Sequence, residues 1–587
     1  MPYDSKTGIH TAPRPEVSLP SGPLSIFDFL FSSEALETRP KDVPVLIDAS
    51  SNRSYTFHGA HQRTLDLARA FHSHGVREND GVVLFSPNDI DYGPVLFASF
   101  RQGVIASCAN PEYQAEELAH QLETVNGAHP VKLIVAHPDS VVTTVKACEK
   151  TGLSSELIVT IGSSATSCPT NVKPLASGFP SLDDLVKSTR GAPFPPKVTL
   201  EQSEQRTKLA LLSFSSGTTG LPKAVMIPHF AVIANVLQAT KHWEETSDFS
   251  PHSTEERRGD VVCGSLPFYH IYGLVVALHG SFYQGLPVVI LPRFQLSLFL
   301  DAVQRHHISI LYVVPPIIIM LVKSELTKDY DLSSLRLAMT GAAPLTDDTL
   351  AAFRAKFPEV TAGQAYGMTE CCTVVSCCPA NDRAFSGAAA GILTGNIEAR
   401  IVSLDGKFLG PNEIGELWSR GPSNALGYLN NEKATKETFD EEGFVHTGDE
   451  AKIDENGLLY IVDRIKELIK VSGFQVAPAE LEGHLLTLDD VQDVAVIGIP
   501  EDKRGEAPKA FVVLSSPAKS RLESGKTTEA ALVQSIKQHV LDHKIKYKAL
   551  AEVELIEAIP KTASGKLLRK DLRVLHAQKA KSKKQKM

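Results

Sequence analysis

The sequence lacks the long apolar run that a membrane-spanning helix needs, which is roughly 18 or more residues. The nearest candidate, residues 313–322, is 10 residues long and contains Pro315 and Pro316, so we expect it in a buried core. Residues 1–20 are polar and carry several prolines, without the apolar segment of a secretory signal peptide. We therefore predict no membrane span.

Cysteine is also scarce, with eight in 587 residues, so a disulfide framework is not expected. Four of them form two adjacent pairs, and this spacing differs from the C-x₂-C pattern of a zinc site. We expect small buried thiols in a reducing compartment. The clustered residues are Cys371, Cys372, Cys377 and Cys378.

An excess of positive charge is missing too, because the formal net charge is -9 and the pI about 6.1. This balance gives no footprint of a nucleic-acid-binding protein. The one basic run, residues 579–587, contains five lysines and is predicted to be a disordered, solvated tail. Hydrophobic residues make up 43% of the chain, a proportion typical of globular proteins with a large core.

Short apolar runs spaced by helical segments predict an α/β fold for the first two thirds of the chain. Such runs suit the buried strands of a parallel sheet. The expected strands are residues 81–85, 133–136, 157–161, 288–291 and 308–314.

The pattern changes after about residue 385. Short strands at 399–402, 415–418 and 458–462 are separated by glycine, proline and asparagine turns, which favours an antiparallel, barrel-like piece. A smaller α+β unit then follows, with strands and a helix on either side of a polar loop. Its expected strands are 494–497, 510–513 and 552–556, its helix 529–541 and its loop 515–530.

These patterns predict a division of the chain into a large N-terminal domain and a smaller C-terminal domain. We expect an extension at 1–24, βαβ layers at 25–385, the barrel-like subdomain at 386–463, the small domain at 464–575 and a basic tail at 576–587.

The clearest signal for function is a loop rich in glycine and hydroxyl groups that follows an apolar strand. Glycine lets backbone N–H groups approach phosphate oxygens, while hydroxyls and a lysine add donors and positive charge. Because the lysine follows Leu221 and Pro222, the loop is not a Walker A motif. It predicts a nucleotide phosphate site through Ser215, Ser216, Gly217, Thr218, Thr219, Gly220 and Lys223.

This loop resembles the signature of the adenylate-forming superfamily, which includes acyl-CoA synthetases, coumarate–CoA ligases, luciferases and adenylation domains of peptide synthetases. The resemblance covers roughly residues 25–575, with Ala224 where many members have glycine. It implies that the chain uses ATP and Mg²⁺ to convert a carboxylic acid into its acyl-AMP. Transfer of the acyl group to coenzyme A is then expected.

Two further motifs resemble the nucleotide pocket of that superfamily. In the turn 341–345, small side chains let a flat ring lie on the backbone. In 364–370, the resemblance implies that Tyr366 packs against adenine, Thr369 binds the α-phosphate and Glu370 holds Mg²⁺. The candidate contacts are Gly341, Ala342, Ala343, Gln364, Ala365, Tyr366, Gly367 and Thr369.

The resemblance also assigns polar residues of the C-terminal third. Asp449 is expected to accept both ribose hydroxyls, and Arg464 to bind ribose or phosphate. Lys566, in the motif 560–566, is expected to neutralise charge during adenylation, and Lys470 to serve the second half-reaction. Further candidate cofactor contacts are Lys466 at the hinge, Arg293, Ser472 and Gly473.

The segment 266–273 resembles the acyl-pocket motif, in which His270 lines the channel for the substrate carboxylate. The expected pocket walls favour an apolar acid, either aromatic or of medium chain length. Hydroxycinnamate, phenylacetate-like, medium-chain and long-chain acids all remain open. The wall residues are Tyr272, Val276, Pro315 and Gly341.

The implied chemistry is in-line attack of the carboxylate on the α-phosphorus of ATP, which depends on positioning and electrostatic stabilisation. Alternatives are loading of a carrier protein, a luciferase-like oxidation and a non-catalytic scaffold. The end of the chain, residues 585–587, is only loosely similar to the Ser-Lys-Leu peroxisomal signal. We expect a cytoplasmic enzyme, with the peroxisome as the alternative location.

Overall fold

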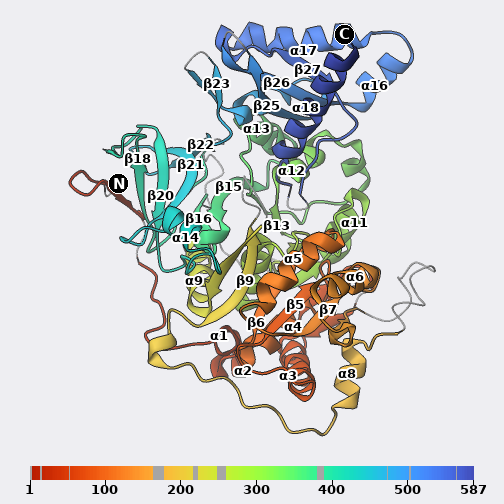
Figure 1. Ribbon diagram of the computed structural model, residues 1–587, viewed down its shortest axis with the longest axis vertical. Coiled ribbons are helices and arrows are strands. Elements are labelled where there is room, and N and C mark those ends of the chain that lie inside the picture. The colour runs from red at the N-terminus through yellow and green to blue at the C-terminus, as the bar shows by residue number, and fades with distance from the viewer. Residues whose placement is uncertain are drawn as a thin grey trace.

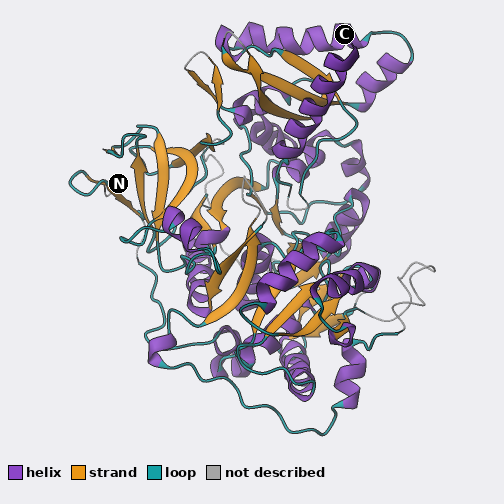
Figure 2. Ribbon diagram, viewed as in Figure 1, coloured by secondary structure: helices purple, strands orange, loops and turns teal. Residues whose placement is uncertain are grey.

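The structure is a computed structural model that describes residues 3–13, 16–51, 53–162, 178–215, 222–246, 259–379, 389–471, 474–501, 504–562 and 565–586. Figure 1 shows three regions: a helix-covered body in the lower half, an antiparallel sheet at its upper left and a separate C-terminal lobe at the top. Helices and strands are mixed both in the body and in the C-terminal lobe (Figure 2), as the predicted α/β and α+β classes require. No described helix is both long and apolar enough to cross a bilayer.

The first sheet has six strands in the order β10-β9-β6-β5-β7-β8, and all its pairs are parallel except β9 with β10. Every residue of β5 and β6 is buried, which explains why these strands are apolar on both faces. The predicted strands at 81–85, 133–136 and 157–161 are confirmed. The strands are β5 (Gly81–Phe85), β6 (Ile105–Ala109), β7 (Val131–Ala136), β8 (Ile158–Thr160), β9 (Leu209–Ser215) and β10 (Lys223–Pro228).

The second sheet has nine strands in the order β17-β16-β15-β14-β13-β11-β12-β3-β4. Its centre is parallel and both edges are antiparallel. The predicted strands at 288–291 and 308–314 lie in its centre. The strands are β3 (Pro44–Asp48), β4 (Ser54–Thr56), β11 (Val262–Gly264), β12 (Val288–Ile290), β13 (Ile310–Val313), β14 (Leu337–Thr340), β15 (Thr361–Met368), β16 (Thr373–Cys377) and β17 (Ile392–Leu393).

Helices cover these two sheets, and α4 is buried along nearly its whole length. The segment 313–322 forms the end of β13 and the buried helix α12, as its composition predicted. A π-helix, η4 (Tyr272–Gly280), begins within the acyl-pocket motif. The other helices are α1 (Ile26–Leu30), α2 (Ser33–Thr38), α3 (Phe57–Ser73), α4 (Tyr92–Arg101), α5 (Ala115–Asn126), α6 (Val141–Thr151), α8 (Leu182–Ser188), α9 (His229–Thr246), α10 (Ser281–Gln284), α11 (Leu296–His306), α12 (Pro315–Lys323) and α13 (Asp347–Lys356). Short 3₁₀ turns are η1 (Pro138–Ser140), η2 (Ser155–Leu157), η3 (Gln202–Glu204), η5 (Glu325–Asp329) and η6 (Thr369–Cys371).

The antiparallel sheet follows the path β1-β2-β18-β20-β21-β22, with β19 paired to β18. The N-terminal extension contributes β1 and β2, since β2 pairs directly with β18. The closure of this antiparallel sheet into a barrel stays a prediction. The elements are β1 (Tyr3–Asp4), β2 (Ile9–Thr11), β18 (Glu398–Val402), β19 (Phe408–Leu409), β20 (Gly415–Arg420), α14 (Glu432–Thr438), β21 (Val445–Ile453) and β22 (Leu459–Arg464).

The C-terminal lobe packs helices on a five-stranded sheet of order β24-β23-β26-β25, with β27 beside β26. Two predictions about it are wrong. The polar loop 515–530 contains helix α16, anchored by the buried Ala518, and the basic tail is helical to Lys586, anchored by the buried Leu572. The elements are β23 (Ile469–Val471), β24 (Phe474–Val476), α15 (Pro478–Leu485), β25 (Val491–Glu501), β26 (Gly505–Leu514), α16 (Ser516–Glu523), α17 (Glu529–His543), η7 (Lys546–Lys548), β27 (Glu552–Leu555) and α18 (Arg569–Lys586).

The lobe touches the body through α12, α13 and the β13–α12 junction. The Lys323 ammonium donates to the carbonyl oxygens of Leu486 at 3.1 Å and Val491 at 2.7 Å. Gly483 lies so close to Thr346 that a Cβ atom there would be 1.9 Å from the threonine Cγ2. These contacts fix the orientation of the lobe in this structure.

Asn88 ties the first sheet to the loop that carries the acyl-pocket motif. It follows β5 and is buried, and its amide nitrogen donates to the carbonyls of Gly264 at 3.1 Å and Leu266 at 2.8 Å. Its amide oxygen accepts the backbone N–H of Phe268 at 2.7 Å. One side chain therefore satisfies three buried backbone groups just before His270.

We predict that Asn88→Ala lowers the free energy of unfolding by about 2–4 kcal/mol, because it removes three buried hydrogen bonds and leaves their partners unsatisfied. Urea unfolding followed by fluorescence measures the change. Asn110→Ala is the control, since it removes a single exposed bond to the Glu112 amide. Equal midpoints for the two variants would contradict the anchoring role of Asn88.

Candidate functional site

Asp449 forms one centre of the candidate site. It lies on β21, is buried, and accepts a hydrogen bond of 2.6 Å from the Tyr366 hydroxyl on β15. The Arg464 guanidinium on β22 lies 3.3 Å from its other oxygen. Burial raises the pKa of Asp449, while Arg464 and the Tyr366 hydrogen bond oppose that rise. The structure thus brings together the three residues predicted for adenine and ribose.

Glu370 forms the second centre. It lies in η6, is buried, and one of its oxygens accepts bonds from the Tyr428 hydroxyl at 2.8 Å and the Ser215 hydroxyl at 3.2 Å. The Lys223 ammonium lies 4.7 Å from the centre of the Tyr428 ring, within cation–π range. The predicted metal ligand and the two ends of the predicted phosphate loop therefore surround one tyrosine.

The phosphate loop connects two paired strands, because Ser215 on β9 is the register partner of Lys223 on β10. This hairpin holds the loop ends side by side at the edge of the six-stranded sheet. Ser216, Gly217, Thr218, Thr219 and Gly220 lie outside the described residues, as do Ser472 and Gly473.

Tyr428 is the site residue that the sequence analysis missed. It is buried, donates to Glu370 and receives the Lys223 ammonium on its ring, yet it belongs to none of the recognised motifs. Backbone bonds hold its segment against the site, including Ala425 N–H to the Glu370 carbonyl at 2.8 Å. Only tertiary structure brings it there, so no local signal in the sequence could have found it.

Of the residues predicted for the acyl pocket, Tyr272 and Gly341 lie side by side. The Tyr272 hydroxyl donates to the Met339 carbonyl at 3.1 Å, which fixes the ring beside Gly341. A Cβ atom on Gly341 would lie 3.3 Å from that ring, so glycine at this position avoids a tight contact with it. Val276 lies one turn further along η4, and Pro315 begins α12.

The turn after Gly341 has an unusual backbone, since Ala342 has φ of 70°, a left-handed value. The Gln364 side chain braces this turn, accepting from the Leu345 N–H at 2.7 Å and donating to the Leu345 carbonyl at 3.0 Å. Both polar ends of Gln364 thus position the turn that includes Ala343. Gln364 lies on β15, which continues through Ala365 to Gly367. A Cβ atom on Gly367 would overlap the Thr373 carbonyl oxygen at 1.4 Å.

Lys566 is the catalytic candidate that the C-terminal lobe brings to the body. Burial, followed by Arg464, lowers its pKa to about 8, while Asp449 and Glu370 act in the opposite direction. The neighbouring Gly565 lies against Val314, where a Cβ atom would be 3.0 Å from a valine methyl. The lysine therefore belongs to the same electrostatic cluster as both carboxylates.

His270 shares this environment. Burial, reinforced by the Lys566 charge, lowers its pKa to about 4, so the imidazole is neutral at pH 7. Its Nδ1 accepts the Tyr272 N–H at 3.3 Å. Thr369, the first residue of η6, is adjacent to Glu370. The predicted channel residue and the predicted phosphate contact thus adjoin the acyl pocket and the carboxylates.

Three predicted residues have no contact with this cluster among the described interactions. Arg293 is exposed and its guanidinium lies 4.0 Å from the Asp139 carboxylate. Lys466 and Lys470 are exposed, and the Lys470 backbone N–H donates to the Glu506 carboxylate at 2.8 Å. In this orientation of the lobe, Lys566 faces the site and Lys470 faces solvent.

Comparison with known proteins supports the same assignment. Residues 32–429 match the AMP-binding enzyme family, and residues 480–566 match the AMP-binding enzyme C-terminal domain. The chain belongs to the AMP-binding enzyme family. The predicted superfamily, and with it an acid–thiol ligase that works through an acyl-AMP, is thereby confirmed.

Curated relatives and a solved structure are similar to this protein over nearly the whole chain. The chain is 36% identical to 4-coumarate--CoA ligase 1 of Arabidopsis thaliana over 563 residues, 95% of this chain and 94% of that protein. It is 33% identical to the probable 4-coumarate--CoA ligase 2 of Dictyostelium discoideum, with 97% and 98% covered. ATP-bound MatB from Rhodopseudomonas palustris has a similar structure, with a TM-score of 0.78, 26% identity and 94% and 98% covered.

We predict that adenylation weakens as the pH rises through about 8, because Lys566 loses its charge there. The direction of this pH dependence follows because a lysine is protonated, and therefore positively charged, only below its pKa. Measure kcat/KM for ATP by pyrophosphate release between about pH 6 and 10, without coenzyme A, since kcat/KM reports the free enzyme. Above the pKa, the value should fall roughly tenfold per pH unit.

Lys566→Arg separates charge from other effects, because arginine stays protonated over this range. Its profile should be level where that of the wild type falls. Lys470→Arg is the matched control and should keep the wild-type profile. A wild-type kcat/KM that stays level up to pH 9.5 would remove Lys566 from the adenylation step.

Proposed function

We propose that this chain activates an arylpropenoic acid of the 4-coumarate type, with ATP, and transfers the aryl-acyl group to coenzyme A. The observation that carries the proposal is the 36% identity with a 4-coumarate–CoA ligase over 95% of the chain. The position of Tyr272 beside Gly341 supports it, because a tyrosine ring in the predicted acyl pocket offers a planar aromatic acid a surface to pack against.

In the first step, a carboxylate oxygen of the acid attacks the α-phosphorus of ATP and pyrophosphate leaves. The nucleophile and the triphosphate are both anions, so positive charge must meet them. Lys566 and Lys223 supply it, and the neutral His270 adds no charge of its own. Thr369 contributes a hydroxyl donor to the α-phosphate. This arrangement acts by electrostatic stabilisation.

We propose Glu370 as the ligand of Mg²⁺. Its carboxylate is a hard oxygen donor of the kind that Mg²⁺ prefers, and it is oriented by Tyr428 and Ser215 at the end of the phosphate hairpin. Mg²⁺ neutralises triphosphate charge when it is bound. The residues present therefore fit the ion.

In the second step, the thiol of coenzyme A attacks the acyl carbon, the carbonyl–phosphate bond breaks and AMP leaves. We propose that the lobe turns about Lys466, so that Lys566 withdraws and the face with Lys470 meets the same pocket. Lys466 is exposed on the segment that joins β22 to the lobe, and Lys470 is exposed on β23 of the lobe, which leaves both accessible for such a turn. A few hinge residues suffice for rotations of this kind.

The substrate proposal is tested with a panel of acids in a coenzyme A thioester assay. We expect the highest kcat/KM for 4-coumarate, and lower values for phenylacetate and decanoate. Phenylalanine should be poorer than phenylpropanoate by about 10²-fold, because the segment 268–273 offers no carboxylate to its ammonium group. A preference for decanoate over 4-coumarate would overturn the substrate class, and acyl transfer only to a carrier protein would overturn the acceptor.

We predict opposite defects for the two lysines when the half-reactions are assayed separately. Lys566→Ala should slow pyrophosphate release by about 10²–10⁴-fold, the range for a lost positioned charge in the transition state. It should spare thioester formation from supplied acyl-AMP. Lys470→Ala should do the reverse. Lys466→Pro should impair the second step most, since proline fixes φ at the hinge.

Equal slowing of both steps in Lys566→Ala and in Lys470→Ala would contradict the two-face scheme. Lys537→Ala serves as the control variant. Its ammonium donates to the Ala551 carbonyl inside the lobe, at 2.6 Å, and it belongs to neither face. Both half-reactions of that variant should match the wild type.

For its location, we propose the cytoplasm, with the peroxisome as the alternative. The peroxisome is kept as the alternative because residues 585–587 are loosely similar to a peroxisomal signal, and the cytoplasm is favoured because that similarity is weak. A fluorescent fusion at the N-terminus, with and without those three residues, distinguishes the two.

A further inference from the structure

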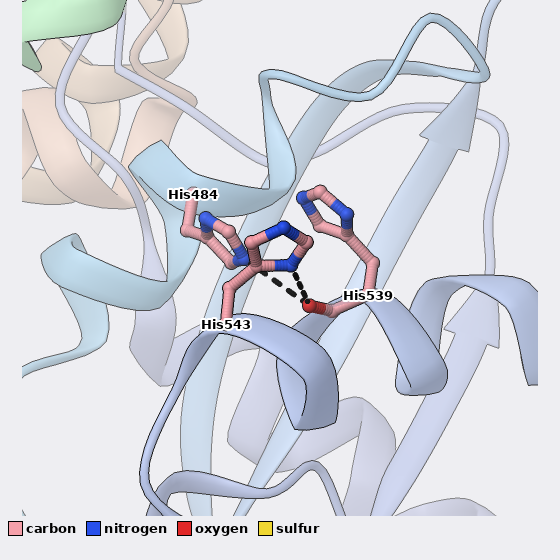
Figure 3. A group of neighbouring side chains, drawn as sticks. All are labelled: His484, His539 and His543. Carbon is pink, nitrogen blue, oxygen red and sulfur yellow. Dashed lines mark hydrogen bonds between the residues drawn. The ribbon is translucent and has the colours of Figure 1, made fainter.

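Three histidines from two helices of the C-terminal lobe meet at one point (Figure 3). His484 lies near the end of α15, and His539 and His543 lie one turn apart near the end of α17. Each can offer one ring nitrogen, and these nitrogens all lie within 4.8 Å of one another. An i, i+4 pair on one helix with a third ligand from a neighbouring helix is a common way to build a metal site.

The three rings pack against one another. The His484 and His539 rings stack with centroids 4.2 Å apart and planes 10° apart, and His543 lies 4.8 Å from His539 and 5.3 Å from His484. Zinc–nitrogen bonds of about 2.0–2.1 Å require nitrogens roughly 3.3 Å apart. The rings are half-buried or exposed, so side-chain rotation can close the remaining gap.

Backbone groups support these imidazoles in the manner typical of metal-binding histidines, whose second nitrogen donates to a carbonyl. The His539 carbonyl oxygen lies 3.3 Å from His484 Nε2 and 2.9 Å from His543 Nδ1, as the dashed lines in Figure 3 show. When these nitrogens carry the protons, the other nitrogen of each ring keeps its lone pair. The Thr487 hydroxyl lies 3.3 Å from His539 Nε2.

The surrounding charges are balanced. Glu480, on the same helix as His484, pairs with Lys544 at 3.2 Å and with Lys548 at 2.5 Å. Asp542 lies next to His543 and accepts from Gln538 at 2.7 Å. The two carboxylates offset the two lysines, so the local field does not exclude a divalent cation.

We propose that His484, His539 and His543 bind one divalent transition-metal ion of the zinc class, with water in the remaining position. Imidazole donors favour Zn²⁺, Co²⁺, Ni²⁺ and Cu²⁺ over Mg²⁺, which prefers oxygen. The ion would join α15 to α17 and so stabilise the lobe. The site uses none of the residues proposed for adenylation.

The test is Zn²⁺ binding to the full-length protein after treatment with a chelator, measured by calorimetry in the absence of ATP. We expect one equivalent to bind at this site, with excess Mg²⁺ present. Co²⁺ in its place should give the visible absorption of a low-coordinate nitrogen site. Zn²⁺ should also raise the midpoint of thermal unfolding, because it binds only the folded lobe.

His543→Ala removes an exposed ligand at the end of a helix, and it should weaken this binding by about 100-fold or more, beyond the loss typical of supporting residues. His74→Ala is the matched control. That histidine is also exposed at a helix end, with its Nδ1 3.1 Å from the carbonyl four residues earlier. His539→Ala is a second variant, with its fold checked by circular dichroism.

Two results would overturn the proposal: no Zn²⁺ bound by the wild type, or equal binding by the wild type and both cluster variants. In the second case the ion binds elsewhere on the chain. Neither result bears on acyl-AMP formation, which is assayed with Mg²⁺ alone.

Discussion

Two buried carboxylates, Asp449 and Glu370, form the centre at which Lys566 of the C-terminal lobe meets the body. Burying a charge without a partner is costly, and the body alone gives these groups Tyr366, Tyr428, Ser215 and the half-exposed Arg464. The C-terminal lobe adds Lys566, whose own burial lowers its pKa to about 8. Burial disfavours the charged form of Lys566 while Asp449 and Glu370 favour it, so the two carboxylates offset part of the cost of docking this lysine.

The rest of the body holds that cluster in place. A β-hairpin brings the two ends of the phosphate loop together, and the carboxyl end of β15 leads directly into η6 with Glu370. Asn88 fixes the loop before His270 from the other sheet. Rigid strands therefore carry the site residues, while the segment around Lys466 joins the two lobes. This division suits an enzyme that must keep one pocket and exchange the face that covers it.

Sequence reasoning succeeded where the signal is local. Continuous apolar runs such as 81–85 are buried strands because both faces of a parallel sheet are covered, and the motif residues Tyr366, Asp449 and Arg464 do meet. It failed where long-range packing decides. The basic tail is helical because it continues α18, whose first turn contains the buried Leu572, and no motif includes Tyr428. The three histidines are 59 residues apart at the extremes, and only the packing of α15 on α17 unites them.

The most direct test of the account traps the lobe in the orientation seen here. Gly483 and Thr346 face each other so closely that a Cβ on the glycine would lie 3.2 Å from the threonine Cβ, which a small shift brings into the range of a disulfide. The seven described native cysteines are buried and should not interfere. The oxidised Thr346→Cys/Gly483→Cys enzyme should release one equivalent of pyrophosphate and then stop, and reduction should restore thioester formation. If the oxidised enzyme forms the coenzyme A thioester as fast as the reduced enzyme, one fixed orientation serves both steps and the account is wrong.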